Sequence, residues 1–501
     1  MSAAAAALRD FNDVVLWYFV VLNSSYLLLI FIASFEVAHL IRRASFVTHE
    51  DTFSNPLTPP VSIIVPAHNE EAVIVESIRA MLALKYSEFE VIVVDDGSTD
   101  ETFGRLRDAF ELERIERVAP GQIETIGEVT SVYTARTGEP LVVIRKVSAG
   151  LRSDAVNAGL DLARYPLVCM VDADSILEET ALLAVAKPFV DDPQHVVAAG
   201  GLIRGANGSA IYRGHIEDAR QSSRWLARIQ NVEYIRSFLL GRLGWSRMGS
   251  LLIISGAFGL FRRDVVLEVG GLDPRSLGED AELVTSIHEH LRAAGRKYRV
   301  VFVPEPVCWT KVPETFAQLA EQRRRWSRGL AQLVRKHRRM LARPKYGVIG
   351  TVAMPYYIAF ELLGPVLETV SIFALVAGLV FGVVSPWFAV AFGLAAVGYG
   401  LLVSCVALTV EEIAFHRYSR WRDLQRSFGA AVAETIGYRQ LHSWWRLRGL
   451  YDEIRGHEAA WGEMKREGFA AVDLHDGTTA PAIGGDCGRQ RESDTIAALS
   501  E

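Results

Sequence analysis

Three short carboxylate motifs could do chemistry in this sequence. Asp95 and Asp96 precede a Gly-Ser turn, so their oxygens could accept hydrogen bonds from a nucleobase or a ribose. Asp172 and Asp174 flank one alanine, and such a pair can bind Mg²⁺ or Mn²⁺ together with diphosphate oxygens. Asp280 ends a Gly-Glu-Asp motif, where it could serve as a general base.

Each of these motifs also has a structural interpretation. Asp96 or Ser98 could cap a helix that begins near Thr99, and a D-x-D pair could be two solvated acids on a surface turn. Asp280 could simply be stabilised at the N-terminus of a helix that begins near Ala281. Taken one at a time the motifs favour these structural roles, so only their combination can support a function.

A fourth motif is basic and aromatic, and it lies shortly before an apolar part of the chain. It runs from Gln322 through three arginines to Trp326. The fork of Arg325 matches diphosphate oxygens, and a tryptophan face can stack on a sugar ring. A basic interfacial helix with a Trp anchor, bound to anionic lipid head groups, is the alternative.

Alternating strand and helix patterns between about residues 60 and 309 predict an α/β domain with a mostly parallel, Rossmann-like sheet. Ligands of such sheets bind beyond the carboxyl ends of the strands, which is where the acidic motifs stand. The stretch 104–139 is interpreted as an insertion that ends in a hairpin of 129–133 with 141–144. The predicted strands are 61–65, 91–94, 141–144 and 167–171, and the predicted helices are 70–83 and 99–110.

Apolar segments near both ends predict membrane helices. Residues 14–35 carry no charge and are long enough for one crossing, which favours an anchor over a cleaved signal peptide. Residues 369–410 are also uncharged and are broken at Ser385-Pro386, which predicts a helical hairpin. The segment 348–367 could be a broken, interfacial or pore-lining helix, and 424–450 could lie on a membrane surface or pack on the catalytic domain.

The charge distribution sets the expected orientation and excludes one class of partner. Arg42 and Arg43 follow the first apolar segment, and arginines flank both sides of the hairpin, so the positive-inside rule places the α/β domain in the cytoplasm. With a formal net charge of -6, the chain is not expected to bind nucleic acid. Its four cysteines show no CxxC spacing, which argues against a zinc site or a disulfide framework.

The motifs together resemble glycosyltransferase family 2, and their order resembles its processive membrane-bound synthases of poly-N-acetylglucosamine, hyaluronan, chitin and cellulose. The resemblance covers roughly residues 60–339. Members often have a lysine where this chain has Arg152, whose forked geometry differs from a point charge. The matching segments are Val61 to Glu71, Asp95 to Ser98, Asp172 to Asp174, Gly278 to Asp280 and Gln322 to Trp326.

This resemblance implies a GT-A-like fold and inverting transfer of a sugar from a nucleotide sugar, usually a UDP-sugar, to an acceptor hydroxyl. Asp280 would be the general base, and Asp172 and Asp174 would hold Mg²⁺ or Mn²⁺ with the diphosphate. The acceptor and diphosphate would contact Gln322, Arg325 and Trp326. The nucleotide-sugar site would comprise Ala67, Glu70, Asp95, Asp96, Arg152 and Asp172.

The leading hypothesis is a multi-pass enzyme of the cell membrane that adds sugars, with UDP-GlcNAc as the best candidate donor, to a growing polysaccharide at the cytoplasmic face. The alternative is a non-processive transferase that acts on a lipid-linked acceptor. Membrane lipids are expected partners, and the sequence identifies no accessory export protein. The expected segments are a transmembrane helix (1–45), a glycosyltransferase domain (58–340), transmembrane or interfacial helices (347–412), a cytoplasmic amphipathic segment (413–475) and a disordered tail (476–501).

Overall fold

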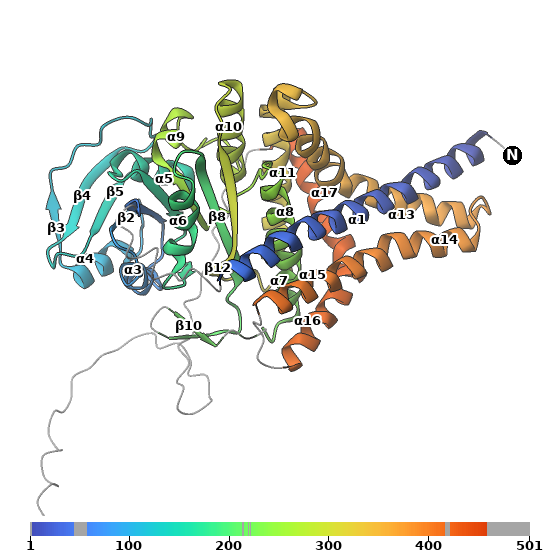
Figure 1. Ribbon diagram of the computed structural model, residues 1–501, viewed down its shortest axis with the longest axis horizontal. Helices are drawn as coiled ribbons and strands as arrows, with labels where there is room; N and C mark the ends of the chain where they lie inside the picture. Colours follow the sequence, from blue (N-terminus) through green and yellow to red (C-terminus); the bar gives the residue numbers. More distant parts are fainter. Residues whose placement is uncertain are drawn as a thin grey trace, which may run out of the picture.

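The computed structural model describes residues 3–44, 58–212, 215–218, 220, 222–415 and 421–457. An α/β domain occupies one end of the molecule, and the helices α1 (Ala3–Ala44), α13 (Gly364–Val380) and α14 (Pro386–Gly393) extend from the other (Figure 1). The predicted fold class, an α/β domain with apolar helices at both ends of the chain, is therefore confirmed. The expected disordered tail lies outside the described residues.

The sheet has ten strands in the order β3-β4-β5-β2-β1-β6-β11-β8-β12-β7. Four neighbours, β5 (Leu141–Lys146), β2 (Phe89–Asp96), β1 (Val61–Ala67) and β6 (Leu167–Val171), are parallel, as the sequence predicts. Their almost fully buried, β-branched runs are typical of strands covered on both faces. The other strands are β3 (Leu112–Ile115), β4 (Val129–Ala135), β7 (Ile176–Leu177), β8 (Val196–Gly205), β11 (Phe258–Arg262) and β12 (Arg299–Thr310).

The sheet as a whole is mixed rather than mostly parallel. β4 pairs antiparallel with β5, which confirms the hairpin expected at the end of the insertion, and β3 extends that edge. β11 is antiparallel to both of its neighbours, β6 and β8. Sequence patterns could not reveal β11 in this position because its apolar run has the same appearance in either direction.

Helices cover both faces of the sheet and enclose two apolar clusters. One close contact is made by Gly159 of α5 (Arg152–Leu162), where an added Cβ would lie 2.5 Å from Cγ2 of Ile64. The helices of this part are α3 (Ile74–Leu82), α4 (Thr102–Phe110), α6 (Ala181–Asp191), α7 (Trp225–Tyr234), η1 (Ile235–Gly241), α8 (Arg242–Arg247), α9 (Arg263–Glu268), α10 (Glu279–Ala293) and α11 (Phe316–Lys336), and β9 (Ala210–Tyr212) pairs with β10 (His215–Asp218).

Two helices in the described residues, Ala3–Ala38 and Pro386–Ile413, are long and apolar enough to cross a membrane. A third candidate is a bent pair, Ile349–Leu362 with Gly364–Val380, whose halves meet at 45°. The expected hairpin is present, and the segment whose depth the sequence left open is the first half of this bent pair. The remaining elements are η2 (Arg338–Met340), η3 (Pro344–Tyr346), η4 (Ile349–Ala353), α12 (Met354–Tyr356), η5 (Tyr357–Leu362), η6 (Leu394–Gly398), α15 (Tyr399–Phe415), α16 (Trp421–Ala433), η7 (Glu434–Tyr438) and α17 (Arg439–Arg455).

Helix α17 packs along α11, between the sheet and the candidate membrane helices (Figure 1). A Cβ on Gly449 would lie 2.5 Å from the carbonyl oxygen of Arg324, so the two backbones are close. Ser327 donates a hydrogen bond to the carbonyl of Arg446 at 2.8 Å, and Arg324 pairs with Asp452 at 2.6 Å. Residues 424–450 were interpreted either as a helix on a membrane surface or as one that packs on the α/β domain. For α17 the second interpretation is correct.

A buried lysine joins two strands to α5. Nζ of Lys146 lies 2.6 Å from Asp96 Oδ1 and 2.8 Å from Asp154 Oδ2, and the Lys146 side chain is fully buried. Burial acts to raise the pKa of Asp154, but hydrogen bonds from Lys146 and from the amides of Ile126 and Gly127 outweigh it and lower that pKa. The lysine thus compensates the charges of two largely buried carboxylates.

Replacing Lys146 by Met should destabilise the α/β domain by about 3–5 kcal/mol, because it leaves two buried carboxylates without their cation. Urea unfolding of the detergent-purified protein, followed by tryptophan fluorescence, measures this change. Lys85→Met is the control, because Lys85 and Glu179 form a pair with side chains that are 64% and 45% exposed, and such a pair contributes at most about 1 kcal/mol. Equal unfolding midpoints for the two variants would contradict the proposed role.

Candidate active site

The carboxyl ends of β1, β2 and β6 bring the first two acidic motifs to one edge of the sheet. Ala67 at the end of β1 is in register with Asp95 of β2, and β1 also pairs with β6. Asp172 and Asp174 follow β6 directly. The strand ends therefore place the four carboxylates of the two motifs on the edge where ligands of such sheets bind.

The Asp95-Asp96 motif forms a tight turn rather than a helix cap. Asp95 is fully buried and accepts hydrogen bonds from Ser98 N and from Arg145 Nε, both at 3.1 Å. Asp96 accepts from Lys146 and, at 3.0 Å, from Ser148 Oγ. Helix α4 begins only at Thr102 and has no side-chain cap, so the capping interpretation of Asp96 is wrong.

Hydrogen bonds connect the loop after β1 to this turn and to the start of α4. Asn69 has a positive φ of 56°, and its Oδ1 accepts a hydrogen bond from Thr99 N at 2.8 Å. The amide of Glu70 donates to Thr102 Oγ1 at 2.8 Å, and the Glu70 side chain is 5% exposed. Ala67 is thus paired with Asp95, Glu70 is held against the start of α4, and both residues are largely buried.

Arg152, the first residue of α5, joins the second motif to the third. Its Nε lies 2.7 Å from Asp172 Oδ1, and one terminal nitrogen lies 2.6 Å from Glu279 Oε1. The other terminal nitrogen donates to the carbonyl of Gly256 at 2.7 Å. One guanidinium therefore brings together segments that are far apart in the sequence.

Asp280 lies beside this network. Its Oδ2 accepts a hydrogen bond from Gly256 N at 3.1 Å, and its Oδ1 accepts from Ala281 N at 2.8 Å. It stands in the first turn of α10, where the helix dipole favours a negative charge. The N-cap residue is Gly278, so Asp280 itself is not the cap.

Negative charge is concentrated next to Asp280. Burial, followed by the charge of Asp172, raises the pKa of Asp174 to about 7. Arg325 of α11 is within electrostatic range of Glu279, Asp280 and Asp172, which oppose the lowering of its pKa by burial. The acids of the second and third motifs thus share one site with Arg152 and Arg325.

Helix α11 presents different side chains of the fourth motif in different directions. Arg323 is buried and pairs with Glu233 at 2.7 Å, whereas Arg325 is near the acidic site. Trp326 is 36% exposed, and the guanidinium of Arg323 lies 4.4 Å from its ring centroid. Oε1 of Gln322 is buried and has no hydrogen-bond partner within the part of the chain that the structure describes.

α11 approaches the third motif very closely. A Cβ on Gly329 would lie 2.8 Å from Gly278 N, and Leu277 N donates a hydrogen bond to Gln332 Oε1 at 3.0 Å. Helix α11, which also carries the residues predicted for the acceptor end, is therefore held against the segment that leads into Asp280.

Four residues that shape the site are not among those predicted from the sequence: Lys146, Glu279, Arg323 and Arg242. Lys146 ends β5, so the rule that ligands bind at the carboxyl ends of strands could have drawn attention to it. Glu279 lies inside a recognised motif, and Arg323 lies inside another. Arg242 is buried and near enough to Asp280 for their charges to interact, but no sequence pattern marks it.

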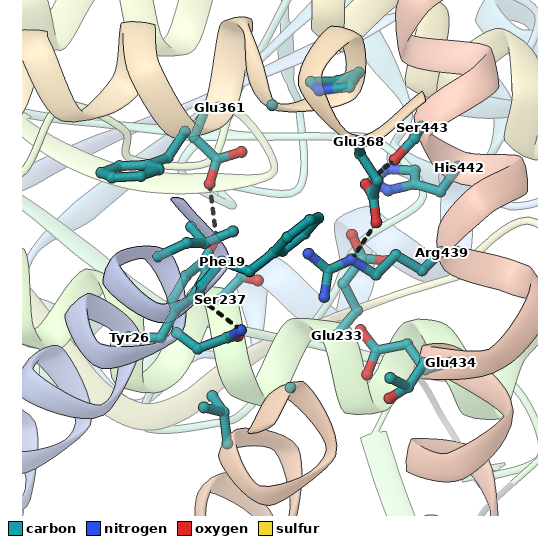
Figure 2. A pocket seen from close by; sticks show the side chains of 18 of the residues that line it. Phe19, Tyr26, Glu233, Ser237, Glu361, Glu368, Glu434, Arg439, His442 and Ser443 are labelled. Carbon is teal, nitrogen blue, oxygen red and sulfur yellow. Dashed lines mark hydrogen bonds and ion pairs between the residues drawn. The ribbon is translucent and has the colours of Figure 1, made fainter. Parts of the chain in front are cut away.

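A cavity of about 130 Å³ lies where the membrane helices meet α17 (Figure 2). Glu368 pairs with Arg439 at 2.7 Å, and Glu361 pairs with Arg446 at 3.1 Å and accepts from Tyr26 Oη at 3.0 Å. Glu361 and Glu368 both line this cavity. Glu233, the partner of Arg323, lines it as well, so α11 contacts both the acidic site and a wall of the cavity.

Comparison with known proteins identifies the family. The pattern of the glycosyltransferase like family 2 matches residues 59–329, and that of chitin synthase matches residues 273–421. A poly-beta-1,6-N-acetyl-D-glucosamine synthase of Staphylococcus aureus (strain COL) is 28% identical over 300 residues, which are 60% of this chain and 59% of the relative. The probable glycosyltransferase YdaM of Bacillus subtilis (strain 168) is 27% identical over 282 residues, 56% of this chain and 57% of that protein.

Among solved structures, the mannosyltransferase PcManGT of Pyrobaculum calidifontis, in complex with GDP-Man and Mn²⁺, is 19% identical, with a TM-score of 0.49 over 85% of this chain and 99% of that one. The matches to both curated relatives span less than two thirds of those relatives' lengths. The family pattern, in contrast, spans more than half of this chain. The protein therefore belongs to the glycosyltransferase like family 2 and is a glycosyltransferase.

Proposed function

We propose that this enzyme transfers N-acetylglucosamine from UDP-GlcNAc, with inversion at the anomeric carbon, to a growing polysaccharide at the cytoplasmic face of the membrane. The acidic site formed by Asp172, Asp174 and Asp280 with Arg152 and Arg325 carries the proposal, because it combines leaving-group and acceptor chemistry. The choice of sugar and of polymer rests on the likeness to the Staphylococcus aureus synthase, which covers 59% of that relative.

The donor would lie across the carboxyl edge of the sheet. Asp96 and the Asp95-supported turn would receive the nucleoside, with Ala67 and Glu70 closing that end. Arg152 would meet the diphosphate at the other end of the edge. The contacts from Asp96 through Lys146 to Asp154 on α5, the helix that also carries Arg152, support one continuous donor site.

A divalent cation fits the residues that follow β6. Asp172 and Asp174 are hard oxygen donors, and burial, followed by the charge of Asp172, raises the pKa of Asp174, so a cation at this place would stabilise the ionised form. The described residues contain no group of three or more His, Cys, Asp or Glu side chains that could hold a metal ion. Two carboxylates nevertheless suffice for Mg²⁺ or Mn²⁺ when diphosphate oxygens complete the coordination, and such a cation would stabilise the charge of the departing UDP.

At the acceptor end Asp280 would take the proton of the acceptor hydroxyl. That oxygen forms a bond to the anomeric carbon while the bond from this carbon to the diphosphate breaks, so the configuration inverts. Trp326 and the buried Oε1 of Gln322 would contact the acceptor sugar, and Arg325 would bind the diphosphate. An unsatisfied buried amide oxygen is costly, and a sugar hydroxyl could donate to it.

The helices beyond residue 347 would hold the product. The cavity in Figure 2 has aromatic and paired charged walls, and α11 connects its wall at Glu233 with the acidic site. The positive-inside rule supports a multi-pass arrangement with the domain at 58–340 in the cytoplasm. On this proposal residues 1–45 and 347–412 are membrane segments, and 413–475 is a cytoplasmic segment.

The donor and the product can be tested together. The purified full chain in detergent should incorporate label from UDP-GlcNAc, rather than from UDP-glucose or UDP-glucuronate, into a polymer when Mn²⁺ is present. Size-exclusion chromatography of the labelled product measures its length. Butanol-soluble label in place of polymer would select the lipid-linked acceptor, and short products under excess donor would rule out processive synthesis.

The proposed base has its own test. Asp280→Asn should reduce transfer by about 10²-fold or more while UDP binding, measured by calorimetry, stays within a few fold. The amide keeps the shape of the side chain but cannot accept the proton. Glu268→Gln is the control, because Glu268, at the end of α9, forms a surface pair with Arg296, and the variant should leave both quantities unchanged. Equal loss of transfer and of UDP binding in Asp280→Asn would contradict the assignment.

A further inference from the structure

Arg152 makes more contacts within the protein than a residue that only binds a diphosphate would need. Its guanidinium touches one carboxylate of the D-x-D motif, Asp172, and one carboxylate beside the proposed base, Glu279. It also donates to the carbonyl of Gly256, the residue whose amide donates to Asp280. In this structure the arginine therefore occupies the middle of the acidic site.

The guanidinium supplies positive charge where the proposed cation would also supply it. Both of its close contacts to Asp172 are with Oδ1, at 2.7 Å. The Arg152 side chain is only 14% exposed, so water screens these contacts weakly. A divalent cation bound to Asp172 would stand next to a buried like charge, which raises the energy of binding it.

Contacts of Asp154 hold the first turn of α5 in place, so the change that we consider is one of the Arg152 side chain. Asp154, two residues further along α5, is fully buried and tied to Lys146 and to the amides of Ile126 and Gly127. A diphosphate would offer the guanidinium new acceptor oxygens, to which its fork is well matched. Arg152 then has partners in both situations: carboxylates before the donor binds, and phosphate oxygens afterwards.

We propose that Arg152 is an internal counter-ion that competes with the divalent cation for Asp172, so that the cation binds tightly only together with a nucleoside diphosphate. Through its contacts with Glu279 and Gly256, the same side chain also links the state of the donor site to the position of the proposed base. Arg152 is thus a positioning residue for both halves of the reaction. This inference rests on the proposed function, because it takes Asp172 and Asp174 as the cation site.

The arginine suits this role better than a lysine would. Its planar fork reaches Asp172, Glu279 and Gly256 at once, whereas an ammonium group is a single point of charge on a flexible stem. Arg152→Lys should therefore keep the positive charge but lose part of the bridge. Arg152→Met keeps a side chain of similar bulk without charge.

The test is Mn²⁺ binding, followed by the loss of the electron paramagnetic resonance signal of free Mn²⁺, with the full chain in detergent. Without nucleotide, Arg152→Met should bind Mn²⁺ about tenfold or more tightly than the unmodified protein, because a competing charge is gone. Arg152→Lys should fall between the two. When UDP is added, the gain in Mn²⁺ affinity should be at least about tenfold smaller in Arg152→Met than in the unmodified protein.

Two controls separate this inference from the proposed function. Arg296→Met removes an exposed arginine of the Glu268 pair and should leave Mn²⁺ binding unchanged. Asp174→Asn should abolish UDP-dependent Mn²⁺ binding, and if it does not, the proposed cation site itself is wrong. If Asp174→Asn does abolish it while both Arg152 variants bind Mn²⁺ alone as the unmodified protein does, the counter-ion role is overturned and the proposed function stands.

The Lys variant also guards against a folding defect. Arg152→Lys preserves charge at the start of α5, and its thermal midpoint can be compared with that of the unmodified protein. If Arg152→Met does not fold, a few-fold tighter binding of Mn²⁺ alone by folded Arg152→Lys still supports the proposal. Unchanged or weaker binding by that variant overturns it.

Discussion

The architecture of the site depends on holding several carboxylates close together at one edge of a sheet. Like charges in a poorly solvated place repel one another, so each acid needs a cation or several hydrogen-bond donors. Lys146 forms ion pairs with Asp96 and Asp154, and Arg152 forms ion pairs with Asp172 and Glu279. Lys146 ends β5 and Arg152 begins α5, so the two cations stand at opposite ends of the turn that joins these elements. The charges at the sheet edge and at the first turn of α5 therefore form one connected unit.

Helix α11 extends this unit toward the candidate membrane helices. Successive residues on a helix point about 100° apart, so three consecutive arginines reach three different surroundings. Arg323 pairs with Glu233 at the wall of the cavity, Arg324 pairs with Asp452 of α17, and Arg325 faces the acidic site. A displacement of α11 would therefore affect the acidic site, the α17 contact and the cavity wall together.

Local sequence patterns predicted much of the fold. The four parallel strands, the antiparallel hairpin after the insertion and the three apolar regions were predicted because periodicity and charge-free length report directly on burial. The mixed direction of the sheet was not predicted, since β11 is inserted between β6 and β8 by long-range pairing. The position of residues 439–455 along α11 likewise depends on a close backbone contact at Gly449. No sequence pattern in either helix predicts this contact.

For the site, the sequence by itself determined which acids, arginines and aromatic residues are available and that several of them follow strands. The tertiary structure alone decided that Arg152 bridges Asp172 and Glu279, that Lys146 is buried between two carboxylates, and that Gln322 keeps a buried oxygen without a partner among the described residues. The physical reason is that residue type and local periodicity determine chemistry and burial. The pairing of charges, in contrast, depends on distances across strands and helices that are far apart along the chain.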